Sequence, residues 1–156
     1  MFDLHARLVW LLPLRLCCGW FLAISGFGKV ESGWLTQPLV LGKVEAALQA
    51  GTAYRFYIPV LHQALHHGQA VSIAVALLEL CAGAALLVGL VSRGAALVGF
   101  VLIANQLLLL GDASSSPLLP LGAALLALLA CPSGRVLGLD ALLWGTRQGL
   151  RRGARE

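Results

Sequence analysis

Two charged residues interrupt long apolar stretches of the sequence, and their side chains offer the most chemistry. Arg15 lies in the apolar run 8–28, and Glu79 lies in the run 71–91. A charge inside an apolar helix is costly to bury, so it usually faces other helices and has a polar partner. Arg15 and Glu79 could therefore fix the register of two helices, bind a polar ligand group or hold a proton.

A third apolar run, 94–110, carries the amide side chains of Asn105 and Gln106. With a helical rise of 1.5 Å per residue, Arg15, Glu79 and Asn105 come at about 10, 18 and 16 Å from the same side of a bilayer. These similar depths predict one buried polar cluster. The residues leave open whether this cluster is a structural ion pair or a site for a ligand or a proton.

The first run places Arg15 and Lys29 on one helix face, because steps of three and four residues connect them. Small residues on the first two helices would let their backbones approach closely, namely Gly19, Gly26, Gly83 and Gly89. Lys29 lies at the far end of the first run. It is either an anchor in the lipid interface or a contact for an anionic or quinone-like head group.

The histidines and cysteines complete no ligand set. His62 and His66 are four residues apart, which is a spacing found in metal sites, but no cysteine or carboxylate pattern accompanies them. Cys17 and Cys18 are adjacent, and the sequence has no Cys-x-x-Cys motif that would indicate an exchanging thiol pair. We therefore predict neither a metal site nor haem.

The composition of the chain is that of a membrane protein. Of 156 residues, 59% are hydrophobic and 12% charged, against roughly 45–50% and about 25% in soluble domains. The mean hydropathy is +0.86. Such a chain lacks the polar surface that would cover a water-soluble globule.

The apolar runs predict a single all-α membrane domain over residues 1–156, a polytopic four-helix bundle. Its expected spans are 8–28, 71–91, 94–110 and 117–131, of which the last is short for a crossing. An extracytoplasmic loop, 29–70, separates the first two spans. Its proline and glycine residues divide it into two short amphipathic helices, over 39–50 and around 54–67.

The basic residues predict the orientation of the bundle. One side of the membrane would hold seven of them, Arg7, Arg93, Arg135, Arg147, Arg151, Arg152 and Arg155. The other side would hold three, Lys29, Lys43 and Arg55. Because basic loops stay in the cytoplasm, we expect both termini there, in the inner membrane of a bacterium. The basic tail 132–156 would then contact lipid head groups rather than nucleic acid.

Several short patterns resemble the DoxX family. Leu14-Arg15-Leu16, Gly19, Phe21 and Gly26-Phe27-Gly28-Lys29 resemble its first helix. The stretch from Glu79 through Gly83 and Gly89 to Arg93 resembles its second helix and turn, and residues 134–140 resemble its closing segment. The loop around Thr36-Gln37-Pro38-Leu39 is most similar to members near the small DoxD-type subunit of thiosulfate:quinone oxidoreductase.

This resemblance implies a membrane subunit associated with quinone-linked redox metabolism, which in this family includes sulfur compounds. It implies a quinone as the candidate ligand, a redox protein or a second copy as partner, and four candidate ligand-binding residues, Arg15, Lys29, Glu79 and Asn105. The reaction does not follow from the family, and whether the chain is an enzyme stays open. The alternative is a non-catalytic assembly or scaffold protein whose polar cluster only fixes helix packing.

Overall fold

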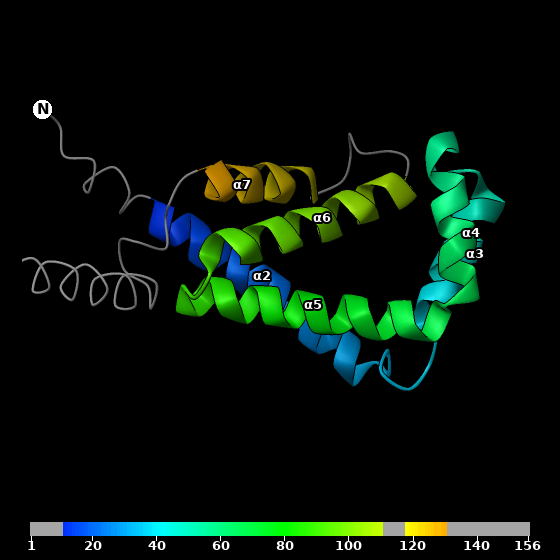
Figure 1. The fold of residues 1–156 in the computed structure, drawn as a ribbon, viewed down its shortest axis with the longest axis horizontal. Coiled ribbons are helices and arrows are strands. Elements are labelled where there is room, and N and C mark those ends of the chain that lie inside the picture. The colour runs from blue at the N-terminus through cyan, green and yellow to red at the C-terminus, as the bar shows by residue number, and fades with distance from the viewer. Residues whose placement is uncertain (1–10, 111–117, 131–156) are drawn as a thin grey trace, which may run out of the picture.

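The computed structural model describes residues 11–110 and 118–130, and all regular structure in these two segments is helical. Three helices are long and apolar enough to cross a bilayer, α2 (Leu11–Glu31), α5 (Gly68–Val88) and α6 (Ser92–Leu110). The shorter elements are α3 (Leu39–Ala50), the 3-10 turn η1 (Arg55–Tyr57), α4 (Ile58–His66) and α7 (Leu118–Ala130). The long helices run along the long axis of the molecule, and α3 and α4 lie across one end of them (Figure 1).

Small residues bring α2 and α5 together as an antiparallel pair. A Cβ atom on Gly26 would lie 2.5 Å from the backbone nitrogen of Leu80, and one on Gly19 would lie 3.1 Å from the carbonyl oxygen of Gly83. Gly83 in turn faces the backbone of Ala23. Larger side chains at these glycines would push the two backbones apart, so the glycines fix which residues of α2 and α5 face each other.

Gly89, a predicted helix-packing glycine, is buried at the C-terminal end of α5. It ends α5 with a φ of 74°, a left-handed conformation that glycine adopts without strain. Its backbone N–H donates to the carbonyl oxygen of Ala85 at 2.9 Å. The short turn 89–91 then leads directly into α6, so α5 and α6 are neighbours at this end.

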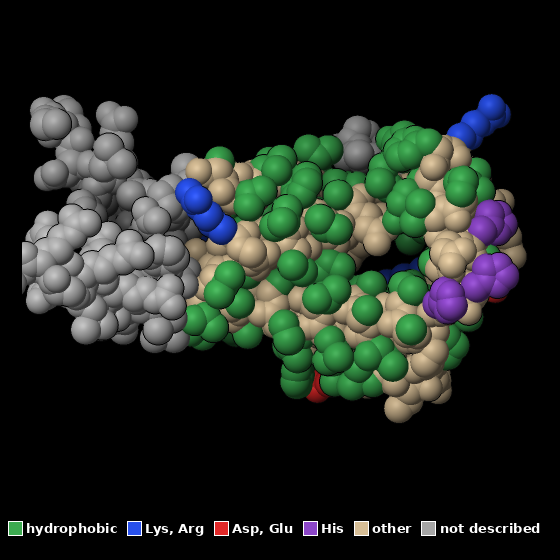
Figure 2. Space-filling model, in the orientation of Figure 1, with side chains coloured by type: hydrophobic (Ala, Val, Ile, Leu, Met, Phe, Trp, Pro, Cys, Tyr) green, Lys and Arg blue, Asp and Glu red, His purple; other side chains and the backbone are tan. Residues whose placement is uncertain are grey.

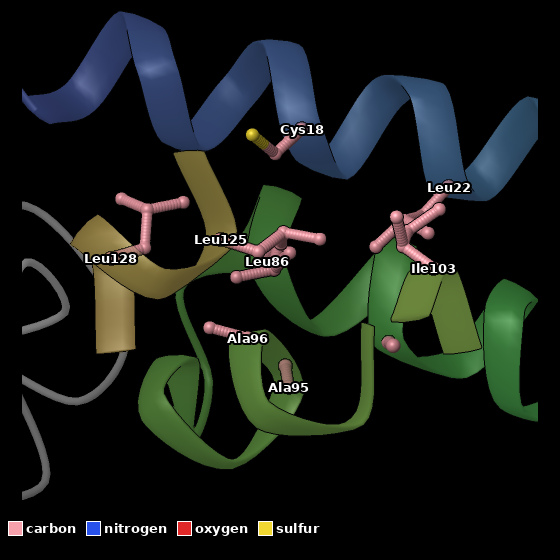
Figure 3. Close-up of a cluster of buried hydrophobic side chains, with 9 residues drawn as sticks. Cys18, Leu22, Leu86, Ala95, Ala96, Ile103, Leu125 and Leu128 are labelled. Atoms are coloured by element: carbon pink, nitrogen blue, oxygen red, sulfur yellow. The ribbon is translucent and has the colours of Figure 1, made fainter. Parts of the chain in front are cut away.

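The apolar core joins four helices at the end of the molecule opposite α3 and α4. Figure 3 shows Leu22 of α2, Leu86 of α5, Ile103 of α6 and Leu125 of α7 converging on one cluster. Because Leu125 and its neighbour Leu128 are fully buried there, α7 is held to the bundle by its apolar face.

The described residues thus give three long apolar helices and one shorter apolar helix, α7, that packs against them. α7 has 13 residues, fewer than the roughly 20 that a straight crossing of the hydrocarbon core requires. Four complete crossings therefore remain a prediction. The tail 132–156, including the segment 134–140 that resembles the family's closing segment, lies outside the described residues.

The loop between α2 and α5 folds back onto the helix ends. The helix expected over 39–50 is α3, which has those bounds and ends where Gly51 adopts a φ of 65°. The Ser72 hydroxyl of α5 accepts a hydrogen bond from the backbone of Val40 at 3.1 Å, and the Thr52 hydroxyl donates to the Leu109 carbonyl of α6 at 3.2 Å. The loop is therefore attached to both α5 and α6. We call this end of the molecule the loop end.

Candidate functional site

Glu79 is the centre of a hydrogen-bonded cluster near the middle of α5. The Ser25 hydroxyl donates to Oε2 of Glu79 at 2.8 Å, and the Lys29 ammonium donates to the same oxygen and forms an ion pair with it. The Gln106 amide of α6 donates to Oε1 at 2.8 Å. Both carboxylate oxygens thus have donors, and only 1% of the Glu79 side chain is exposed. Charge-assisted bonds of this kind compensate the cost of burying a carboxylate.

The α2 residues of this cluster lie one helical turn apart. Ser25 and Lys29 share a face of α2 because four residues separate them, and Nζ of Lys29 also donates to Oγ of Ser25 at 3.0 Å. Gly26 lets this face of α2 approach α5 closely, at the level of Leu80. The close contact at Gly26 therefore brings Ser25 and Lys29 within hydrogen-bonding distance of Glu79.

Lys29 also connects the cluster to the loop. Its ammonium nitrogen lies 5.5 Å from the centroid of the Trp34 ring, and that of Lys43 lies 5.1 Å from the same centroid. Both distances suit cation–π attraction. In the described part of the chain Glu79 pairs with Lys29, and no carboxylate forms an ion pair with Lys43.

A second polar link joins the loop to α6. The Tyr57 hydroxyl of η1 donates to Oδ1 of Asn105, the residue beside Gln106. Burial raises the pKa of Tyr57 above the usual value of 10.0, so its hydroxyl keeps the proton and stays a donor at neutral pH. Asn105 and Gln106 therefore anchor α6 to the loop on one side and to Glu79 on the other.

A cavity of about 420 Å³ lies where the loop meets α2, α5 and α6. Its volume is in the range of small-molecule sites, about 300–1,000 Å³. Apolar residues make up much of its wall, among them Val44, Leu61, Val71, Val75 and Leu102. The polar groups include two ammonium groups and two amides, those of Lys29, Lys43, Asn105 and Gln106. On the face drawn in Figure 2, a hollow lies near the loop end, with a basic side chain deep inside it.

Arg15 does not belong to this cluster, and the pairing of Arg15 with Glu79 that similar depths suggested does not form. Lys29 takes that place. Arg15 precedes Gly26 by eleven residues, so it lies about 16 Å farther along α2, away from the loop end. The depth argument assumed that both helices start at one level, whereas α2 extends past the end of α5. Arg15 is nevertheless buried, with 2% of its surface exposed.

The candidate residues from the sequence therefore separate into two places. Lys29, Glu79 and Asn105 contribute to the cavity or to the cluster beside it, and Arg15 lies near the opposite end of α2. Sequence reasoning did not find four residues of the site, Ser25, Trp34, Lys43 and Tyr57. Ser25 carried a usable signal, because it lies one turn before Lys29 on the same helix. The other three come from the loop and reach the site only through its folding.

These features define a class of protein, a helical membrane protein with a ligand-sized cavity where a long loop covers the ends of its spans. The chain belongs to the DoxX family, because the DoxX family model matches residues 10–111. The matched stretch includes the Glu79 cluster and the described lining of the cavity. The comparisons with curated proteins and with solved structures found no match.

Proposed function

We propose that this DoxX-type membrane protein is a quinone-binding subunit of a membrane redox system. The observation that carries the proposal is the cavity at the loop end, which combines apolar walls with several hydrogen-bond donors. A quinone head group is a flat apolar ring with carbonyl oxygens that accept hydrogen bonds. The cavity therefore matches both parts of the molecule.

The donors have separate roles in this proposal. Lys43 and Asn105 face the cavity and would bind the carbonyl oxygens of the head group. Glu79 holds Lys29 in place beside the cavity and balances its charge. Because no carboxylate is among the described residues that line the cavity, a head group that gains negative charge on reduction would meet only neutral or cationic groups there. The electrons would come from a partner redox protein.

The alternative function is a scaffold. The buried Lys29–Glu79 pair favours it, because a buried ion pair can fix helix register without binding any ligand. A scaffold would leave the cavity without a resident quinone. The two functions therefore differ in what the purified protein carries.

The experiment measures quinone bound per protein after extraction into native-lipid discs without detergent. Discs that hold the parent should have a quinone-to-lipid ratio well above that of the source membrane. Lys43→Met and Asn105→Leu should lower the bound quinone severalfold. Gln49→Met is the matched control, since Gln49 is exposed on the same helix as Lys43 and does not line the cavity. A parent without enriched quinone, or cavity variants that keep it, would favour the scaffold.

A further inference from the structure

The cavity is placed between two helices that separate toward the loop end. The turn 89–91 holds α5 and α6 together at one end, and Figure 1 shows the two helices diverging toward α3 and α4, which bridge the open end. Residues of both diverging helices line the cavity, Val71 and Val75 from α5 and Leu102 and Asn105 from α6. The cavity therefore fills the space that the divergence leaves.

The cavity reaches below the ends of these helices. Val75 lies seven residues from the start of α5, or about 10 Å along its axis, and Leu102 lies about 12 Å from the end of α6. Since α5 and α6 are long and apolar enough to span a bilayer, these residues lie at the depth of the hydrocarbon core of the leaflet at the loop end. The lower part of the cavity is thus level with lipid chains.

The cavity is also open on its side. Val60 of α4 and Asn105 of α6 both line it, and both are exposed. The hollow in Figure 2 opens through the face between the long helices rather than at the tip of the molecule. In a bilayer this opening faces lipid, so a molecule dissolved in the membrane reaches it without passing through water.

The charges and the depth together indicate how a ligand lies. Lys43 belongs to the loop, above the helix ends, whereas the apolar side chains of Val75 and Leu102 lie deeper. A ligand with an acceptor-bearing head and an apolar chain would place its head near Lys43 and Asn105. Its chain would leave between α5 and α6 into the leaflet.

We propose that the cavity is filled sideways from the leaflet at the loop end, through an opening bounded by Val60, Val75 and Asn105, and that its ligand is a long-chain quinone rather than a water-soluble molecule. This inference rests on the proposed quinone function for the identity of the head group. The opening between α5 and α6 determines the route and the position of the chain.

The first test uses the parent protein in bilayers and a prenylated benzoquinone with a photoreactive diazirine on its chain. Labelling should map to α5 and α6 near Val75 and Leu102, and unlabelled long-chain quinone should suppress it. Suppressible labelling confined to α3 and α4 would overturn the sideways route but leave quinone binding intact. If no labelling is suppressed by quinone, the proposed function fails as well.

The second test narrows the opening. Quinones quench tryptophan fluorescence, so a variant with Trp10, Trp20 and Trp144 replaced by phenylalanine reports binding through Trp34, which lines the cavity. Adding Val60→Phe and Val75→Phe should slow quenching by the long-chain quinone by about tenfold. Leu78→Phe with Val101→Phe is the control, because these residues are exposed on α5 and α6, the two helices that bound the opening, and do not line the cavity. Equal rates in the two variants would refute the route.

Discussion

Lys29 belongs both to the buried ion pair and to the wall of the cavity. Its ammonium group pairs with buried Glu79, lies beside Trp34 and lines the cavity, while only 12% of its side chain is exposed. A lysine near a helix end could have extended into the lipid interface instead. The carboxylate of Glu79 holds it inside, because removing either partner leaves the other charge buried and unpaired.

The first prediction concerns the energy of this pair. Glu79→Gln and Lys29→Gln should each lower the free energy of unfolding by about 3 kcal/mol or more, because each leaves an uncompensated charge. The double variant should lose clearly less than the sum of the two, since it buries no net charge. Unfolding in mixed detergent micelles measures all four proteins of this double-mutant cycle. Additive losses would mean that Lys29 and Glu79 do not interact.

Arg15 supplies the control for this cycle. It lies about 16 Å from Gly26 along α2 and belongs to a different part of the fold. Arg15→Gln combined with Glu79→Gln should therefore be additive within about 0.5 kcal/mol. Strong coupling between Arg15 and Glu79 would contradict the register of α2 and α5.

The sequence was informative about which residues matter and less about which of them meet. A carboxylate in the middle of an apolar run requires a partner, and this argument correctly singled out Glu79. The choice between Arg15 and Lys29 depended on how far α2 slides along α5, which hydropathy does not encode. The glycine contacts that set this register were visible as residues, but their partners Leu80 and Ala23 were not.

At the scale of elements, the close packing of α2 on α5 requires residues without a Cβ atom at particular positions. Gly26 has the backbone of Leu80 against it, whereas a Cβ on Gly28, two residues later, would meet nothing within 4 Å. The two glycines thus lie on opposite sides of α2. One is required for close approach of the helices, and the other is not.

The second prediction follows from this difference. Gly26→Ala should destabilise the fold by about 1–3 kcal/mol, because the added methyl group overlaps a backbone that cannot move alone. Gly28→Ala should be neutral or stabilise by up to about 1 kcal/mol, since alanine favours the helix. Unfolding in mixed micelles compares the two variants, and the labelling experiment with quinone checks the site. Similar effects at both positions would mean that α2 does not pack on α5 through Gly26.

The positions of the helices themselves were largely predictable. Apolar length located α2, α5 and α6, and the breakers Pro38 and Gly51 defined α3. The return of the loop to α6 was not predictable. It depends on long-range contacts such as Tyr57 with Asn105, which no local pattern announces.

At the scale of the whole molecule, the two ends differ in what they present. The loop end carries the cavity with Lys29 and Lys43, and the opposite end carries the turn 89–91, followed by Arg93 at the start of α6. The count of basic residues by segment predicts that the side away from the loop is cytoplasmic. We propose that the loop end faces the periplasm and that the cavity receives quinone from the outer leaflet.

The third prediction tests this orientation in whole cells. The four native cysteines are replaced by serine, and a single cysteine is then introduced at Gln49 or at Gly153. Gln49 is exposed on α3 at the loop end, so an impermeant maleimide should label that position in intact cells. The position at Gly153 should become reactive only after lysis, because the seven basic residues assigned to that side predict a cytoplasmic location for it. The reverse pattern would place the cavity at the inner leaflet, where a cytoplasmic redox partner would meet it.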